Sequence, residues 1–188
     1  MIFKFMNYLR TRGRCVSGCY VAFTASLQVR GHIDVPDSFR VRSGAKLKIK
    51  SGGSLVAGQN CELKEYSFIT CKASVKLGCN TALGAFCFLD GVGPITFGND
   101  VRVGPGCVFV SSSHNHSNPG VPISQQGLSG HGIEVGNDVW IGANCSIIDG
   151  AKIGDGVVIG AGSVVRGALE SGGVYAGAPA KKIRTRRI

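Results

Sequence analysis

Apolar residues return at every sixth position over much of this chain, and this period limits the folds open to it. The most regular run is Val135, Ile141, Ile147, Ile153, Ile159 and Val165. The residue after each is often Gly, and the fifth position of each block is small or short, as in IGANCS and IGAGSV. An amphipathic helix would repeat its apolar residues at three and four instead. The period therefore predicts short strands joined by tight turns and stacked as coils around one apolar core.

The same period continues toward the N-terminus in shifted phases. Earlier blocks begin at Phe97, Val103 and Phe109, at Leu77, Leu83 and Leu89, at Ala57, Leu63 and Ile69, and more weakly at Val35, Val41 and Leu47. Jumps of two residues fall near 75–77 and 95–97. We therefore expect an all-β repeat domain over residues 30–166, preceded by an N-terminal segment, 1–29, and followed by a C-terminal tail, 167–188.

Composition narrows the setting and the partners. A chain of 188 residues fits one domain. The formal charge of +10 favours an anionic partner: nucleic acid, a phosphorylated cofactor or a membrane surface. Basic residues do not interleave with aromatic ones, which argues against nucleic acid. No stretch is apolar enough to cross a bilayer. The start, MIFKFMNYLRTRGR, lacks the order of a signal peptide, and contact of this basic, amphipathic segment with a membrane surface stays open.

The eight cysteines do not follow a zinc-ribbon or disulfide pattern, because no CxxC pair occurs. Four of them occupy fifth positions of the repeat, where they replace other small apolar residues: Cys61, Cys87, Cys107 and Cys145. Reduced thiols in a core predict a cytoplasmic protein.

One long interruption, from about Ser111 to Gly132, breaks the repeat. It contains SSSHNHSNP, with His114 and His116 one residue apart, and ends near His131. A loop extruded from a rigid repeat is a candidate functional feature. The histidines could form a metal site, supply a catalytic base with a neighbour, or belong to an ordinary polar loop.

HNHSNPGVPISQQG, GIEVGNDVWIGANCSIIDGAKIGDGVVIGAGSVV and GVYAGAPAKKIR together resemble the hexapeptide-repeat acyltransferases. The match is to the O-acetyltransferase branch, near the maltose and galactoside acetyltransferases and the enzymes that acetylate surface polysaccharides. The resemblance implies a left-handed parallel β-helix with one extruded loop. It also implies that His114 is the catalytic base. Asp90 is a candidate partner of that base or a contact for a sugar hydroxyl, and Asn115 and His116 are expected to face the acceptor.

The resemblance also implies a site for acetyl-CoA. Carried over by position, the contacts fall at Ala143 and Ala161, which are flanked by Gly142 and Gly160, and at Lys181 and Arg184 of the tail, with Trp140 as a wall of the groove. Backbone N–H groups at such turns can bond the pantetheine amides, and Lys and Arg can meet the phosphates. The family often has a Thr-Lys-Asp turn after the last full coil, whereas this chain has VVRGALESGG, so Arg166 replaces the Thr.

The predicted function is therefore acetyl transfer from acetyl-CoA to a sugar hydroxyl, with no metal required and no covalent enzyme intermediate. The family implies a homotrimer with active sites between subunits. An amino-sugar or xenobiotic acetyltransferase, a metal-dependent hydratase on the same fold, and a non-catalytic scaffold are the alternatives.

Overall fold

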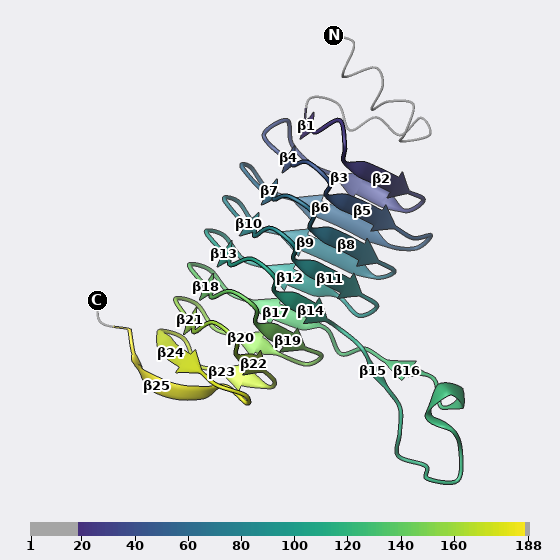
Figure 1. The fold of residues 1–188 in the computed structure, drawn as a ribbon, viewed down its shortest axis with the longest axis vertical. Coiled ribbons are helices and arrows are strands. Elements are labelled where there is room, and N and C mark those ends of the chain that lie inside the picture. Colours follow the sequence, from purple (N-terminus) through teal and green to yellow (C-terminus); the bar gives the residue numbers. More distant parts are fainter. Residues whose placement is uncertain (1–18, 187–188) are drawn as a thin grey trace.

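The computed structural model describes residues 19–186 as a β-solenoid with three parallel sheets (Figure 1). The first sheet contains β1 (Tyr20–Val21), β4 (Arg40–Val41), β7 (Glu62–Leu63), β10 (Ala82–Leu83), β13 (Arg102–Val103), β18 (Trp140–Ile141), β21 (Val158–Ile159) and β24 (Gly173–Ala176). The second contains β2 (Ser26–Val29), β5 (Lys46–Ile49), β8 (Phe68–Cys71), β11 (Phe88–Gly91), β14 (Val108–Val110), β19 (Ser146–Ile148) and β22 (Val164–Val165).

The third sheet contains β3 (His32–Asp34), β6 (Ser54–Ala57), β9 (Ser74–Leu77), β12 (Ile95–Phe97), β17 (Ile133–Val135), β20 (Lys152–Ile153) and β23 (Ala168–Leu169). The chain passes from first to second to third sheet in every coil. We call the turn between the first and second sheets the first corner, and the turn between the second and third sheets the second corner. The expectation of an all-β, left-handed parallel β-helix of hexapeptide repeats is confirmed.

The repeat residues form the core because each lies in register with its counterpart in the previous coil. In the first sheet Leu63 pairs with Leu83, Leu83 with Val103, and Val103 with Ile141. Leu63, Leu83 and Ile141 are fully buried. Each buried aliphatic side chain contributes about 1.5–3 kcal/mol, and the parallel strands satisfy the backbone between coils. The fold is therefore held by contacts between neighbouring coils.

The corners need left-handed backbone conformations, and not all of them use glycine. At the first corner Tyr66 and Phe86 adopt φ of 56° and 59°. Their rings stack on each other with centroids 5.3 Å apart. In the preceding coil, a Cβ on Gly44 would lie 2.4 Å from the Tyr66 ring. Glycine at position 44 therefore leaves room for this aromatic stack.

The solenoid extends beyond residues 30–166 at both ends. Parallel pairing already begins at Tyr20, opposite Arg40, and still holds between Ile159 and Tyr175. At the N-terminal end the apolar period is too weak to reveal β1 and β2, because small residues such as Ala25 fill inward positions there. At the C-terminal end β25 (Lys181–Thr185) turns back and pairs antiparallel with β24.

Residues 1–18, which include the basic Arg10, Arg12 and Arg14 and the whole segment MIFKFMNYLRTRGR considered for membrane contact, lie outside the described residues. Within residues 19–186, no helix has the length and hydrophobicity that a bilayer crossing requires.

The prediction that repeat cysteines act as small core residues is confirmed. Cys61, Cys87, Cys107 and Cys145 are buried and unpaired by disulfides. Cys71 is buried as well, whereas Cys79 is only half-buried. Burial raises the pKa of the Cys61 thiol, and it raises that of Cys71 to about 11.

Thiol labelling tests this packing, because the thiolate is the reactive form and must be reached by the reagent. In the native protein at pH 8 we expect iodoacetamide to modify Cys79 faster than the buried Cys61 and Cys71. All three should react at similar rates in guanidinium chloride. Mass spectrometry of tryptic peptides gives the modified fraction at each site. Equal native rates at the three sites would contradict the buried placement.

Candidate active site

The expected loop leaves the solenoid at the second corner, where β14 ends. It contains the two-stranded hairpin of β15 (Ser113–His114) and β16 (Leu128–Ser129), with the 3₁₀ turn η1 (Ile123–Gln125) between them. The chain returns to the third sheet at Ile133. Figure 1 shows this loop projecting well away from the stacked coils. The extruded loop over about 111–132 is confirmed.

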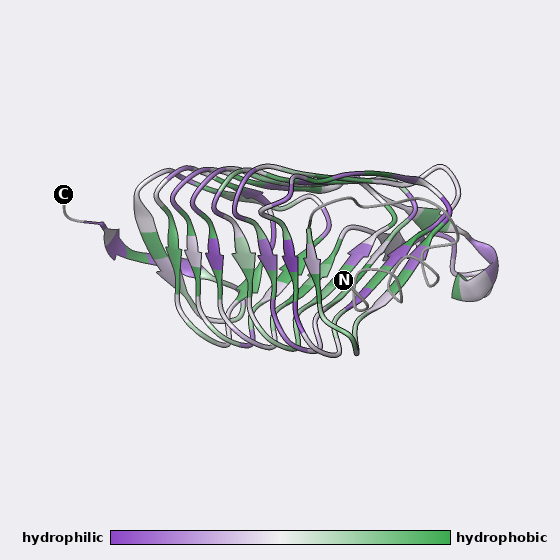
Figure 2. Ribbon diagram, turned by 90° about the horizontal axis from the view of Figure 1, so that it is seen from above, coloured by the Kyte–Doolittle hydropathy of each residue, from purple (hydrophilic) through white to green (hydrophobic). Residues whose placement is uncertain are grey.

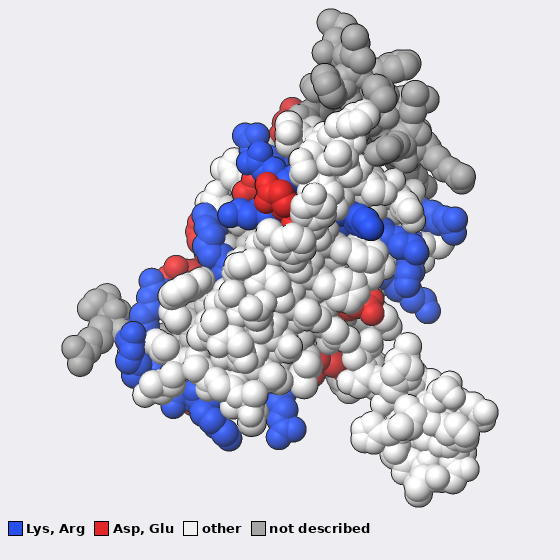
Figure 3. All heavy atoms as spheres, viewed as in Figure 1, with Lys and Arg blue, Asp and Glu red and all other residues white. Residues whose placement is uncertain are grey.

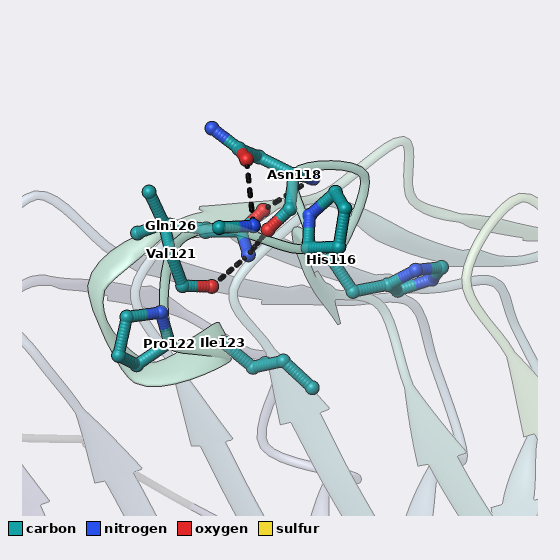
Figure 4. Close-up of a pocket in the computed structure, with 8 residues that line it drawn as sticks. His116, Asn118, Val121, Pro122, Ile123 and Gln126 are labelled. Atoms are coloured by element: carbon teal, nitrogen blue, oxygen red, sulfur yellow. Dashed lines mark hydrogen bonds between the residues drawn. The ribbon is translucent and has the colours of Figure 1, made fainter.

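The loop tip is organised by one side chain, Gln126 (Figure 4). Its Nε2 donates to the carbonyls of Asn118, at 2.8 Å, and Val121, at 2.6 Å, and its Oε1 accepts from the Asn118 N–H. Asn115 adds a further bond, from its Nδ2 to the Gln126 carbonyl at 3.1 Å. The amide of Asn115, expected to face the acceptor, thus bonds within the loop.

Both histidines of the HNH segment are exposed. His114 lies on β15 opposite Leu128, and His116 borders an open pocket at the loop tip (Figure 4). The pocket wall also includes Asn118, Val121 and Ile123. Within residues 19–186 no hydrogen bond engages either imidazole, so both rings are free to meet a ligand.

The third loop histidine has a carboxylate partner that the sequence did not indicate. His131 Nδ1 lies 2.8 Å from Asp149 Oδ2, and Asp149 Oδ1 accepts from the N–H groups of His131 and Gly132, both at 2.8 Å. The Asp149 side chain is 5% exposed and that of His131 76%. Burial disfavours the charged carboxylate, but the bonds from the His131 ring and the two N–H groups outweigh it, so the pKa of Asp149 is lowered. Asp149 therefore fastens the returning end of the loop to the coil below.

Asp90, the predicted partner of His114, lies on β11 in the outward row of the second sheet, next to Val110 of β14. Its carbonyl accepts bonds from the N–H and Oγ of Ser111, where the loop begins. In the described part of the chain no hydrogen bond joins its carboxylate to His114. Asp90 borders the base of the loop, which suits contact with an acceptor hydroxyl better than orientation of the His114 ring.

The residues expected to bind the donor gather at the first corner. Gly142 and Ala143 lie above Gly160 and Ala161, because the Gly142 N–H bonds the Ile159 carbonyl and the Gly162 N–H bonds that of Ala143. A Cβ on Gly142 would lie 2.6 Å from the Ala161 nitrogen. Gly142 is therefore needed for coil stacking, whereas Ala161 is exposed on the surface of the corner.

The tail and Trp140 add side chains near that corner. Lys181 pairs with Ala176 and Arg184 with Val174 in the antiparallel strand β25, and both side chains are exposed. Trp140 is 57% exposed on the first sheet, between Arg102 and Val158. Lys181 thus lies at the corner end of β24, whereas Arg184 and Trp140 share one row of the first sheet through Val174 and Val158.

One chain does not bring the donor residues and the loop together. Ala143 precedes β19 and Asp149, at the loop base, follows it, so the two lie at opposite edges of the second sheet. Figure 2 likewise shows the C-terminal strand and the loop at opposite sides of the solenoid. Arg166 follows β22 and is exposed on the loop side, apart from Lys181 and Arg184. The predicted set therefore forms two half-sites.

No group of three His, Cys, Asp or Glu side chains among residues 19–186 is arranged to hold a metal ion. His114, His116 and His131 thus do not form the three-histidine centre considered from the sequence.

Comparison with known proteins identifies the repeat. Residues 132–167 match the family model for the bacterial transferase hexapeptide (six repeats). The chain is 27% identical over 173 residues to a putative lipopolysaccharide biosynthesis O-acetyl transferase, WbbJ, of Escherichia coli K12, covering 87% of this chain and 77% of that protein. It is 32% identical over 108 residues to a probable macrolide acetyltransferase of Lysinibacillus sphaericus, covering 49% of this chain and 60% of that protein.

Solved structures show the same fold. A mutant of the N-acyltransferase AntD from Bacillus cereus, in complex with coenzyme A and dTDP-4-amino-4,6-dideoxyglucose, has a TM-score of 0.69 at 20% identity, covering 84% of each chain. The polySia specific acetyltransferase NeuO has a TM-score of 0.64 at 24% identity, covering 89% of each chain.

The Asp149 contact can be tested through stability. Replacing Asp149 by Ala leaves two backbone N–H groups without their acceptor, and we expect a loss of about 1–3 kcal/mol in the free energy of unfolding at pH 7. A carboxyl whose folded pKa is depressed stabilises above its unfolded pKa and loses that effect as pH falls through the folded pKa. The difference in the free energy of unfolding between wild type and Asp149→Ala should therefore shrink below about pH 4. Urea unfolding at several pH values measures it, with Asp149→Asn as the control that keeps Oδ1. A difference independent of pH would contradict the ionic part of the contact.

Proposed function

The chain belongs to the hexapeptide-repeat acetyltransferases, and we propose that it transfers the acetyl group of acetyl-CoA to a sugar hydroxyl in a surface polysaccharide or its precursor. The observation that carries the proposal is the histidine-bearing, hydrogen-bonded loop at the second corner, in a chain related to a named O-acetyl transferase over most of its length. The coenzyme A complexes of the fold neighbours support acetyl-CoA as the donor. We also propose that the reaction takes place in the cytoplasm.

In the proposed mechanism His114 is the general base. Its imidazole takes the proton from the acceptor hydroxyl as the oxygen attacks the thioester carbonyl. The tetrahedral oxyanion is stabilised by backbone N–H donors and collapses with cleavage of the C–S bond. The imidazolium returns its proton to the departing thiolate. An acetyl ester and free CoA result, without a covalent enzyme intermediate.

The two half-sites support a homotrimer as the working enzyme. The alanine turns proposed to bind the donor lie at the first corner, and the loop projects from the second corner. A neighbouring subunit that presents its first corner to this loop would place the donor thioester near His114. Proximity of the two substrates in such a cleft supplies much of the rate.

The acceptor class has two competitors. The AntD neighbour is an N-acyltransferase with an amino-sugar nucleotide bound, and one relative is a probable macrolide acetyltransferase. An amino group of a sugar and a hydroxyl of a xenobiotic are thus the other candidate acceptors. The product distinguishes transfer to an amino group from transfer to a hydroxyl, because hydroxylamine cleaves an acetyl ester and leaves an acetamide intact.

The His114 assignment predicts the kinetics of a single variant. His114→Ala should lower kcat roughly 10²–10⁴-fold, because general base catalysis contributes that much. Release of free CoA in the presence of a sugar acceptor measures turnover. His32→Ala, which removes an exposed histidine on β3 outside the loop, serves as the control and should keep wild-type turnover. Full activity of His114→Ala would refute the assignment, and the same assay of His116→Ala shows whether the neighbouring ring is the base.

Donor binding is tested separately by calorimetric titration with acetyl-CoA. Hydrogen bonds to charged groups contribute about 1.5–3 kcal/mol each, so Lys181→Ala/Arg184→Ala should raise Kd roughly tenfold or more. Lys182→Ala is the matched control, because Lys182 is engaged with Glu170, at 2.8 Å, instead. No saturable binding to the wild type would overturn the proposed function.

A further inference from the structure

Five exposed cations gather on the N-terminal coils along the second sheet and its second corner. They are Arg30, Lys46, Lys48, Lys50 and Lys72, and we call them the basic edge. Figure 3 shows Lys and Arg side chains on this side of the solenoid, beside β2 and β5 and above the projecting loop. The donor residues at the first corner are not part of this group.

The basic edge has no carboxylate partner in the described structure. The ion pairs within residues 19–186 involve other side chains, namely Arg42–Glu62, His131–Asp149, Lys152–Glu134, Lys182–Glu170 and Arg186–Asp138. Neighbouring coils lie about 4.8 Å apart, so these like charges repel one another. An anionic ligand would relieve that repulsion and would be attracted by the combined potential.

Three of the cations form a ladder that leads to the loop. The Arg30 N–H bonds the Ile49 carbonyl, the Lys50 N–H bonds that of Cys71, and the Lys72 N–H bonds that of Gly91. Arg30, Lys50 and Lys72 thus occupy the same corner position in successive coils.

The next two coils continue this column without charge. Val92 occupies the position after Gly91, and in the following coil the loop begins at Ser111, whose N–H bonds the Asp90 carbonyl. Four coil steps from Arg30 to the loop base span about 19 Å. The ladder therefore points toward the His114 loop and ends two coil steps before its base. The distance from Arg30 to the loop base exceeds a single sugar unit.

The charge pattern changes abruptly at the loop. Residues 111–132 contain no Lys, Arg, Asp or Glu and are rich in Ser, Asn, Gln and Gly. Between ladder and loop lies Asp90, in the outward row that also holds Lys48 and Thr70. Such a surface attracts anions to the N-terminal coils, repels them from the loop base, and offers amides and hydroxyls to a neutral sugar unit.

From this pattern we infer that the basic edge binds the carboxylate or phosphate groups of an anionic glycan and lays the chain along the second corner toward His114. The inference rests on the proposed function and adds the substrate class, an acidic polysaccharide bound over several sugar units. The charged units contact Arg30, Lys50 and Lys72 along the ladder. The acetylated unit faces the uncharged loop.

Direct binding without acetyl-CoA tests the inference. The probe is an oligogalacturonate of about ten units labelled at its reducing end, and a maltooligosaccharide of equal length is the neutral control. Fluorescence anisotropy should show saturable binding of the anionic probe alone, weakening as salt rises. Lys48→Glu/Lys50→Glu/Lys72→Glu should weaken it roughly tenfold or more, because like charge is now placed against the ligand.

A matched variant separates local from overall charge. Arg40→Glu/Lys64→Glu/Lys76→Glu makes the same charge change at exposed positions elsewhere on the solenoid, and it should bind the probe within about twofold of the wild type. Equal losses in the two triple variants would overturn the inference. Binding of the neutral oligomer as tightly as the acidic one, or tighter binding of a single-stranded oligonucleotide of equal charge, would also overturn it.

Acetyl-CoA titration of the same proteins keeps the two proposals apart. The basic-edge variant should bind acetyl-CoA like the wild type, because Lys181 and Arg184 are unchanged. Circular dichroism and Tm confirm that both variants fold, and Lys50→Gln/Lys72→Gln provides a milder version if charge reversal unfolds the N-terminal coils. Glycan binding by a wild type that does not bind acetyl-CoA would support the basic edge while refuting the acetyltransferase proposal.

Discussion

Every feature of this molecule depends on the close stacking of one coil upon the next. The separation is set by parallel backbone hydrogen bonds, such as those from Gly104 to Ile141 and from Gly142 to Ile159 at 2.7 and 2.8 Å. Where two corners meet there is no room for an extra carbon: a Cβ on Gly104 would approach the Ala143 nitrogen to 2.6 Å. The buried aliphatic residues therefore stack in register, and so does every outward residue. Functional side chains in this fold therefore line up in columns along the coil axis, one residue from each successive coil.

The period of six was sufficient to predict this scaffold, because it is a property of the core alone. Each inward position in the run from Val135 to Val165 is buried, and the small fifth positions are filled as expected, for example by Cys145. The extruded loop was equally visible, since it breaks the period. The first coils were missed because Ala25 and Ala22 fill the core without an aliphatic signature. Parallel pairing nevertheless begins at Tyr20.

The site was less predictable, since its contacts join residues that no period relates. Asp149 lies in an ordinary Asp-Gly corner, and nothing in the sequence links it to His131, 18 residues earlier. Gln126 is one of two adjacent glutamines, and only the folded loop shows that it bonds the Asn118 and Val121 carbonyls. Asn115, expected to face the acceptor, also donates a hydrogen bond to the Gln126 carbonyl, which its spacing did not indicate. Hydrogen bonds within a loop depend on how the folded loop brings its residues together, and the spacing of residues in the sequence does not predict this.

Column geometry also explains why one chain carries two half-sites. Each coil has its first corner directly in line with that of the next coil. The turns at Ala143 and Ala161, proposed to bind the donor, therefore stack on each other along the first corner. The loop leaves where β14 of the second sheet ends, which is the other edge of that sheet. Closing the distance within one chain would require the loop to fold back across the second sheet, whereas Figure 1 shows it directed away from the coils. In the homotrimer proposed above, a second copy would supply the donor corner without any change in the solenoid. The basic edge follows the same rule: Arg30, Lys50 and Lys72 line up with the loop base because they share its column, and an extended anionic chain is the ligand shape that such a column can follow.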